Sequence, residues 1–229
     1  MRKQPVRYLL SFLLLLLMLI LASGCCTGTV RELGKAKEHA RSGDLAWIAA
    51  QDVNCKETCE GCNQLHLLKG DACYRLAKQG QEPLKQYPCA AQHLETGISM
   101  TKQWQMESFN LNRPQTYVNL CESLRNWRDL LAGGEADTSN ERLLKDAQAF
   151  LAAEPGNPCG IYFVNDARYA KLRPCLLHPE RCPALCGDLH SMLQSIDEGA
   201  SKATGTMCEA NLQQIKKEVT KAREIVRCP

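Results

Sequence analysis

Cysteine is the residue type most able to do chemistry in this chain, which has 14 cysteines among 229 residues. Cys59 and Cys62 are spaced as a CxxC pair, which thiol–disulfide oxidoreductases place at a helix N-terminus after a strand to lower a thiol pKa. Here Cys55 precedes the pair and no βαβ pattern surrounds it, so structural disulfides are favoured over a redox site. Covalent haem attachment is excluded, because it requires CxxCH and Asn63 follows Cys62.

A second set of possible ligands lies closer to the C-terminus. His178, Cys182, Cys186 and His190 recur every four residues, and histidine with cysteine is a common zinc ligand set. One continuous helix would align all four, but two prolines within this stretch argue against such a helix. We therefore favour disulfide cysteines beside solvated histidines and expect no metal or cofactor, with a metal-binding protein as an alternative.

The sequence contains no complete catalytic motif. It has no GxSxG, HExxH, Walker or Rossmann glycine pattern. Ser99 and Lys102 have the SxxK spacing of penicillin-binding enzymes, but the partner motifs SDN and KTG are missing. We therefore expect no catalytic residue, and an envelope enzyme acting on thiols or on the cell wall is the alternative. The histidines are scattered, at His39, His66, His93, His178 and His190.

The first 24 residues have the pattern of an export signal. Arg2, Lys3 and Arg7 precede an apolar segment over 9–22, which is shorter than the roughly 20 residues that cross a bilayer. The sequence Leu21-Ala22-Ser23-Gly24-Cys25 resembles the lipobox of bacterial lipoproteins, in which the cysteine is acylated and becomes the first residue. The alternatives are an ordinary signal peptide and an N-terminal anchor helix.

The lipobox resemblance implies that Cys25 carries the fatty acids, palmitate among them, and that a short tether follows over 25–29. Cys26 stands where aspartate would signal inner-membrane retention, so the resemblance implies the outer membrane, facing the periplasm. Removal of residues 1–24 leaves 25 basic and 25 acidic residues in place of 28 and 25. A neutral chain offers no basic surface to nucleic acid or to lipid headgroups, so the lipid is the expected membrane contact.

Cysteines in an oxidising compartment are expected to form disulfides. Beyond Cys25 and Cys26 an even number remains, which predicts six disulfides whose connectivity the sequence does not fix. Cys26 is then the unpaired cysteine, next to the lipid. The twelve disulfide candidates are Cys55, Cys59, Cys62, Cys73, Cys89, Cys121, Cys159, Cys175, Cys182, Cys186, Cys208 and Cys228.

Helices must position these residues, because apolar side chains recur at helical spacing and no series of strands is evident. Gly133-Gly134 is expected to end one amphipathic helix over 116–131, and Thr138 with Glu141 forms a capping box for the next. The last helix begins near Thr206. We predict an all-α chain of stacked antiparallel hairpins, with further helices over 30–41, 45–53, 65–77, 88–104, 141–153, 161–172 and 184–196.

The segments 70–77 and 87–98 resemble a tetratricopeptide repeat (TPR), in which small residues let two helices approach closely and a large side chain locks them. The residues that carry the resemblance are Gly70, Tyr74, Ala90, Leu94 and Gly97. Residues 78–86 form an insertion relative to the family's tight turn. The resemblance places Cys73 and Cys89 on the two helices, where a disulfide would join them, as in the similar Sel1-like cysteine-rich proteins.

The sequence therefore predicts a lipoprotein signal peptide over 1–24, a lipidated tether over 25–29 and a single all-α TPR-like domain over 30–229. TPR-like stacks bind peptides or helices on a concave face. We expect a periplasmic interaction scaffold or assembly factor for an envelope or secretion machine, such as a pilotin or a type VI accessory protein. Its partners would be envelope proteins.

Overall fold

The computed structural model describes residues 26–102, 104 and 111–228, and these residues are helical with no strand among them. The all-α prediction is therefore confirmed. Residues 1–25, with the signal peptide and the lipidation cysteine Cys25, lie outside the described residues. A helix over 26–42 is followed by α2 (Leu45–Ala50), α3 (Cys62–Lys78), α4 (Pro83–Met100), α5 (Arg113–Leu130), α6 (Gly133–Ala153), α7 (Pro158–Leu177), η1 (Pro179–Arg181), α8 (Leu185–Lys202) and α9 (Glu209–Ile225).

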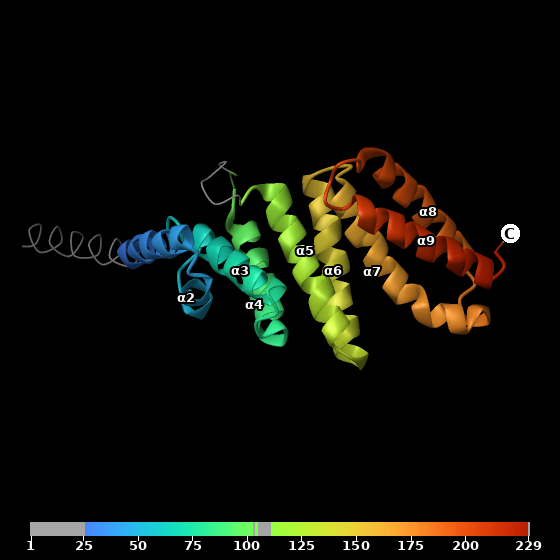
Figure 1. The fold of residues 1–229 in the computed structure, drawn as a ribbon, viewed down its shortest axis with the longest axis horizontal. Helices are drawn as coiled ribbons and strands as arrows, with labels where there is room; N and C mark the ends of the chain where they lie inside the picture. Colours follow the sequence, from blue (N-terminus) through green and yellow to red (C-terminus); the bar gives the residue numbers. More distant parts are fainter. Residues whose placement is uncertain (1–25, 103, 105–110, 229) are drawn as a thin grey trace, which may run out of the picture.

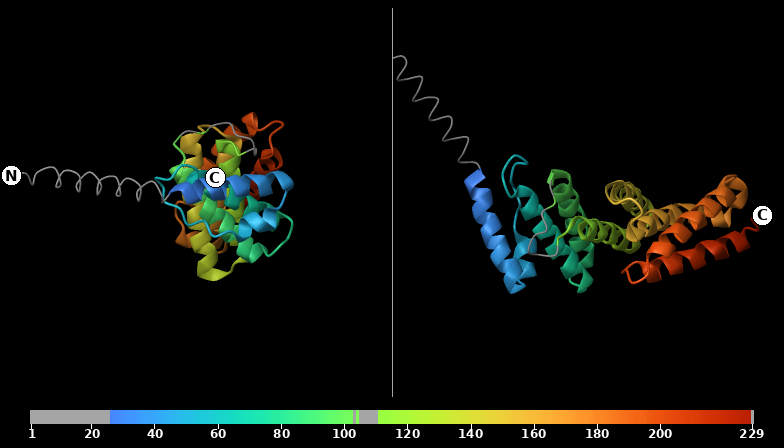
Figure 2. Two further views of the ribbon diagram at one scale, coloured as in Figure 1. Left: turned by 90° about the vertical axis from the view of Figure 1, so that its left-hand side faces the viewer. Right: turned by 90° about the horizontal axis from the view of Figure 1, so that it is seen from above.

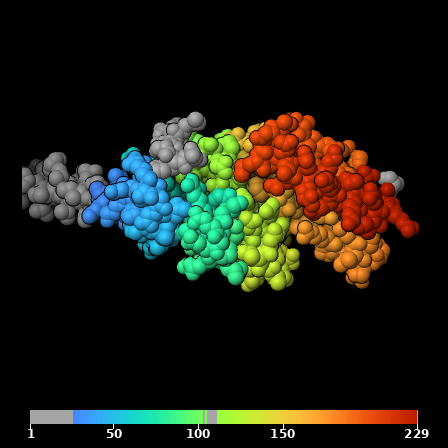
Figure 3. Space-filling model, in the orientation of Figure 1, coloured from blue at the N-terminus to red at the C-terminus, as the bar shows by residue number. Residues whose placement is uncertain are grey.

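Each long helix packs mainly against the helix before it and the helix after it in the chain. From α2 to α7 the helices follow one another in a row, and α7, α8 and α9 then pack together at the far end (Figure 1). Seen from above, helix 26–42 and α9 lie at opposite ends of this row (Figure 2). The space-filling view shows the segments from helix 26–42 to α6 side by side in chain order (Figure 3). Neighbour-to-neighbour packing of this kind is the arrangement of stacked helical hairpins.

Two apolar clusters hold the stack together. The main cluster runs from α3 to α9 and includes the fully buried side chains of Phe150, Leu124 and Leu212. A smaller cluster joins helix 26–42 and α2 to α3 through residues such as Ala36 and Ile48. The apolar faces predicted for α5 and α9 are buried in the main cluster. Within the described residues, no helix is both long and apolar enough to span a bilayer.

The hairpin of α3 and α4 has the close approach expected from the TPR resemblance. A Cβ atom added to Gly70 would lie 2.9 Å from the backbone nitrogen of Leu94, so only glycine fits there without a shift. Cys73 and Cys89 form a disulfide between the two helices, which confirms the pairing that the resemblance implied. The connection is tighter than expected, because α4 begins at Pro83 and the proposed insertion is mostly helix.

Replacing Gly97 by alanine should lower the free energy of unfolding by about 1–3 kcal/mol, because the added Cβ would lie 2.6 Å from Leu67 Cδ2 and 3.1 Å from its backbone nitrogen. Gly34 is the matched control, since it lies within helix 26–42 with nothing within 4 Å of an added Cβ. Gly34→Ala should raise stability by roughly 0.5–1 kcal/mol. Urea unfolding of both variants measures the difference, and equal shifts would contradict close packing at Gly97.

Two sequence predictions about helix starts are wrong. Residues 26–29, expected in a tether, are helical and lie within helix 26–42, and Thr29 is buried. The helix expected at 141–153 begins at Gly133, because Ser139 donates a hydrogen bond to the Leu124 carbonyl and holds this segment against α5. Thr138 donates to the Gly134 carbonyl within the helix instead of capping it.

Candidate functional site

Six disulfides brace the described residues, and five of them join cysteines from the predicted set. They are Cys55–Cys62, Cys73–Cys89, Cys159–Cys208, Cys175–Cys182, Cys186–Cys228 and, from outside the predicted set, Cys26–Cys59. The prediction for two cysteines is therefore wrong: Cys26 is bonded, and Cys121 is a free thiol. Cys121 is fully buried in the middle of α5, and burial raises the pKa of its thiol, which leaves it unreactive.

The CxxC pair does not form a redox disulfide. Cys62 lies at the first position of α3, after Gly61 in a left-handed conformation, but its sulfur is bonded to Cys55. Cys59 is bonded to Cys26, in the helix over 26–42. The sequence shows the spacing of two cysteines along the chain but not which other segments fold back onto them, and here each finds a different partner.

The zinc alternative over 178–190 is also wrong. Cys182 is bonded to Cys175 and Cys186 to Cys228, so the two cysteines belong to different disulfides. The stretch is divided between η1 and α8, as the prolines indicated, and does not form one helix. Similarly, the Ser99 hydroxyl donates to the Thr96 carbonyl of its own helix, and Lys102 lies beyond the end of α4. Ser99 and Lys102, the two residues of the SxxK spacing, therefore do not lie on one helical turn.

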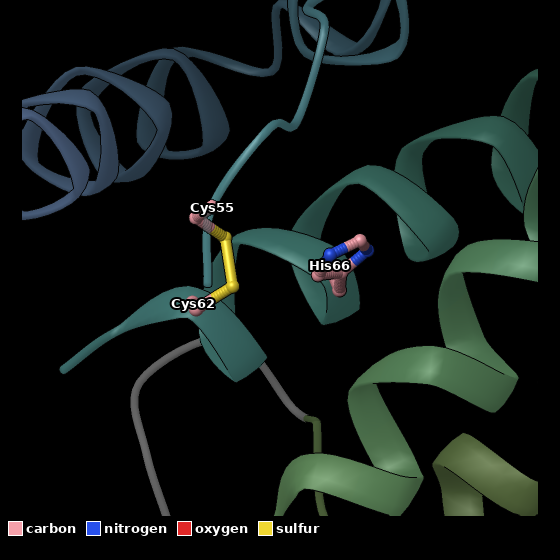
Figure 4. A group of neighbouring side chains, drawn as sticks. All are labelled: Cys55, Cys62 and His66. Carbon is pink, nitrogen blue, oxygen red and sulfur yellow. A yellow bond between two sulfur atoms is a disulfide. The ribbon is translucent and has the colours of Figure 1, made fainter. Parts of the chain in front are cut away.

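A cluster of two cysteines and one histidine lies where the loop before α3 meets that helix. One ligand atom from each of Cys55, Cys62 and His66 lies within 4.8 Å of the other two, and Figure 4 shows the imidazole beside the disulfide. Cys62 and His66 are four residues apart on α3, which places both on one helical face. Only the Cys62–His66 spacing was readable from the sequence. Within the described part of the chain, this is the one such group of three.

His66 also contacts a second histidine, His93 of α4. Their Nδ1 atoms lie 2.8 Å apart, so one imidazole donates a hydrogen bond and the other accepts it. Burial, with the nearby Lys69 and His66 charges, lowers the pKa of His93 to about 4, and burial with the charge of Lys69 also lowers the pKa of His66. Both imidazoles are therefore neutral at pH 7. Asp52 is the acidic group that partly offsets these effects at His93.

Two clefts meet at Leu131, the residue that follows the end of α5. The Arg128 cleft has a volume of about 750 Å³ and lies between α5, α6 and the end of α7, with acidic Asp137 and Glu141 on one wall and basic Lys171 and Arg173 on another. The Trp127 cleft, of about 630 Å³, lies on the other side of the α5–α6 junction. It is lined by Trp127, Leu131, Ala132, Gly134, Glu135, Thr138, Ser139 and Arg142.

A buried arginine, Arg128, links the helices that line the Arg128 cleft. Arg128 Nη1 donates to Asp166 Oδ2 of α7 at 2.8 Å and to Asn140 Oδ1 of α6 at 2.9 Å. Its Nε donates to Asp129 Oδ1 at 2.9 Å. Burial opposes the charge, but the carboxylates of Asp166 and Asp129 outweigh it and raise the pKa of Arg128. One guanidinium therefore joins three consecutive helices at the cleft.

Asp146 of α6 should make stability depend on pH. Its carboxyl is buried beside Cys121, Oδ2 has no hydrogen-bond partner, and burial with the charge of Glu95 raises its pKa to about 6. The folded chain therefore binds a proton that the unfolded chain loses, and stability falls as pH rises from about 4 to about 6. Asp146→Asn should raise the unfolding free energy at pH 7 by about 1–3 kcal/mol and remove this slope.

Urea unfolding at pH 4 and pH 7 measures the effect of Asp146→Asn. The control is Asp188→Asn, an exposed position at the first turn of α8, which should retain the slope. An unchanged slope in Asp146→Asn would contradict the assignment of the proton to this carboxyl.

Comparison of the chain with protein-family models, with curated proteins and with solved structures finds no match.

Proposed function

We propose that the chain is an outer-membrane lipoprotein that acts as a periplasmic interaction scaffold or assembly factor in an envelope or secretion machine. The lipobox resemblance at Cys25 supports the anchor, and six disulfides fit an oxidising compartment. The helix over 26–42 is bonded through Cys26 to Cys59, so an anchor on the preceding residue would hold the stack directly against the membrane surface.

The observation that carries the scaffold proposal is the pair of clefts that meet at Leu131. Helices α5, α6 and α7 form their walls, and the buried Arg128 joins these helices, so the surface is rigid. Opposite walls of the Arg128 cleft carry charges of both signs, at Asp137 and Lys171. Such a surface suits a protein segment with charged side chains of both signs around apolar ones.

Site-specific photocrosslinking in living cells tests this surface. A photoreactive residue at Ala136 or Lys171 in the Arg128 cleft, or at Glu135 in the Trp127 cleft, should crosslink the same envelope protein. Lys221, exposed on α9, is the control position and should not. A crosslink pattern that is the same at Lys221 and in the clefts, or no crosslink from any cleft position, would reject the scaffold surface.

Cys25→Ser should abolish the incorporation of labelled palmitate and release the chain from the outer-membrane fraction, because the acylated thiol would be absent. Cys26→Ser is the matched control at the neighbouring position. It should retain the label and the membrane fraction, since its thiol is placed in a disulfide with Cys59. Metabolic labelling followed by membrane fractionation measures both, and a palmitate signal that survives Cys25→Ser would contradict the lipobox assignment.

A further inference from the structure

The cluster at the start of α3 has the donors of a zinc site, with two of them held in a disulfide. Zinc prefers cysteine sulfur and histidine nitrogen, commonly three or four of them in a tetrahedral arrangement. Cys55, Cys62 and His66 already have their ligand atoms within 4.8 Å of one another. We propose that reduction of the Cys55–Cys62 disulfide converts this cluster into a zinc site formed by Cys55, Cys62 and His66.

Part of the local structure that holds these donors near one another does not depend on the Cys55–Cys62 bond. Cys62 and His66 are fixed on one face of α3 by the helix itself, and Cys62 is fully buried. Cys59, three residues before Cys62, is tied by its own disulfide to Cys26. Opening the Cys55–Cys62 bond therefore frees two sulfurs while the second disulfide still holds the loop that carries Cys55.

His93 is the positioning residue of the proposed site. Its Nδ1 lies 2.8 Å from Nδ1 of His66, so it fixes the orientation of the His66 ring. Metal-binding histidines are commonly oriented by such a partner. The Lys69 charge nearby is offset once two thiolates are formed.

The electrons and protons of the conversion balance when a dithiol is the reductant. The dithiol gives two electrons and two protons to the Cys55–Cys62 bond, which becomes two thiols, and is itself oxidised to a disulfide. Zn²⁺ then displaces the two thiol protons as both sulfurs bind it, so the site gains two negative charges and one divalent cation. A disulfide as the oxidant reverses the step: it accepts two electrons from the two thiolates and two protons from water to become two thiols, the Cys55–Cys62 bond closes, and the zinc is released. The inference does not depend on the proposed scaffold function.

Measurement of zinc binding while the chain is reduced in steps tests the proposal. The full chain is treated with increasing dithiothreitol in the presence of Zn²⁺, opened disulfides are mapped by alkylation and mass spectrometry, and bound zinc is measured after desalting. Wild type should bind one zinc when Cys55–Cys62 opens and none before. Co²⁺ in place of Zn²⁺ should give thiolate charge-transfer absorption at the same point.

The controls use a second disulfide with the same sequence separation of 7, Cys175–Cys182. Cys175→Ser/Cys182→Ser should bind one zinc as wild type does, whereas Cys55→Ser/Cys62→Ser should bind none. His93→Asn should weaken zinc affinity about 10–100-fold, and His66→Asn by more. Equal binding by both double variants would show adventitious thiol binding and overturn the proposal. So would unchanged affinity in His66→Asn, or a Cys55–Cys62 bond that opens without zinc uptake.

Discussion

Arg128→Met should lower the free energy of unfolding by about 3–5 kcal/mol, the largest effect expected from a single substitution in this chain. The substitution removes the guanidinium but leaves its partner Asp166 of α7 largely buried, with a carboxylate that has lost its ion-pair partner. Asn140, also buried, loses its donor at the same time. A buried charge without a partner is far more costly than the pair was stabilising.

A double-mutant cycle separates this explanation from lost packing. Asp166→Leu added to Arg128→Met removes both charges, and replacement of a buried ion pair by apolar groups is often neutral. The double variant should therefore recover most of the lost stability. Asp129→Asn breaks the more exposed of the two ion pairs of Arg128 and should cost less than about 1 kcal/mol.

Urea unfolding with the disulfides intact measures all of these Arg128 and Asp166 variants. A loss below 1 kcal/mol in Arg128→Met, or a double variant less stable than the single one, would contradict the assignment. The same variants report on the clefts, since Arg128 joins the helices that form their walls. If the scaffold surface depends on that rigidity, crosslinking from Ala136 should weaken in Arg128→Met and return in the double variant.

The fold was predictable because its determinants are local. Apolar residues at helical spacing predicted α5 and α9, and most of these residues, such as Leu124 and Leu212, are buried in the structure. The small residues at Gly70 and Gly97 predicted the close α3–α4 hairpin, and the TPR resemblance that they carry implied its Cys73–Cys89 disulfide. The start of α6 was missed, because a tertiary hydrogen bond from Ser139 to α5 outweighs the local capping signal at Thr138.

The functional residues were less predictable because their partners come from distant parts of the chain. Nothing near Arg128 in the sequence indicates that Asp166, on a helix two elements later, is its counterion. The contact between His66 and His93 depends on how α3 packs against α4, although each histidine was visible. Cys26 and Cys121 were assigned the wrong roles for the same reason, since disulfide pairing and burial follow from the fold and not from the count of cysteines.

Removal of the Cys159–Cys208 disulfide should cost about 4 kcal/mol of unfolding free energy. This bond joins the first turn of α7 to the residue that precedes α9 and closes a loop of sequence separation 49. Without it the unfolded chain gains the freedom of that whole loop, and its entropy rises accordingly. Both sulfurs also lie in the main apolar cluster, so Cys159→Ala/Cys208→Ala leaves a small cavity there.

The matched comparison is Cys175→Ala/Cys182→Ala, which opens a disulfide of sequence separation 7 at the end of α7. By the same loop-entropy argument, removal of the shorter loop's disulfide should cost about 2 kcal/mol of unfolding free energy. The two double variants should therefore differ roughly twofold in their loss of stability. Urea unfolding without added oxidant or reductant measures the free energy of unfolding of both double variants. Equal losses would mean that the long loop is already restricted in the unfolded chain, for instance by the Cys186–Cys228 bond that overlaps it. Because that bond remains in both variants, opening it as well should then reveal the missing difference.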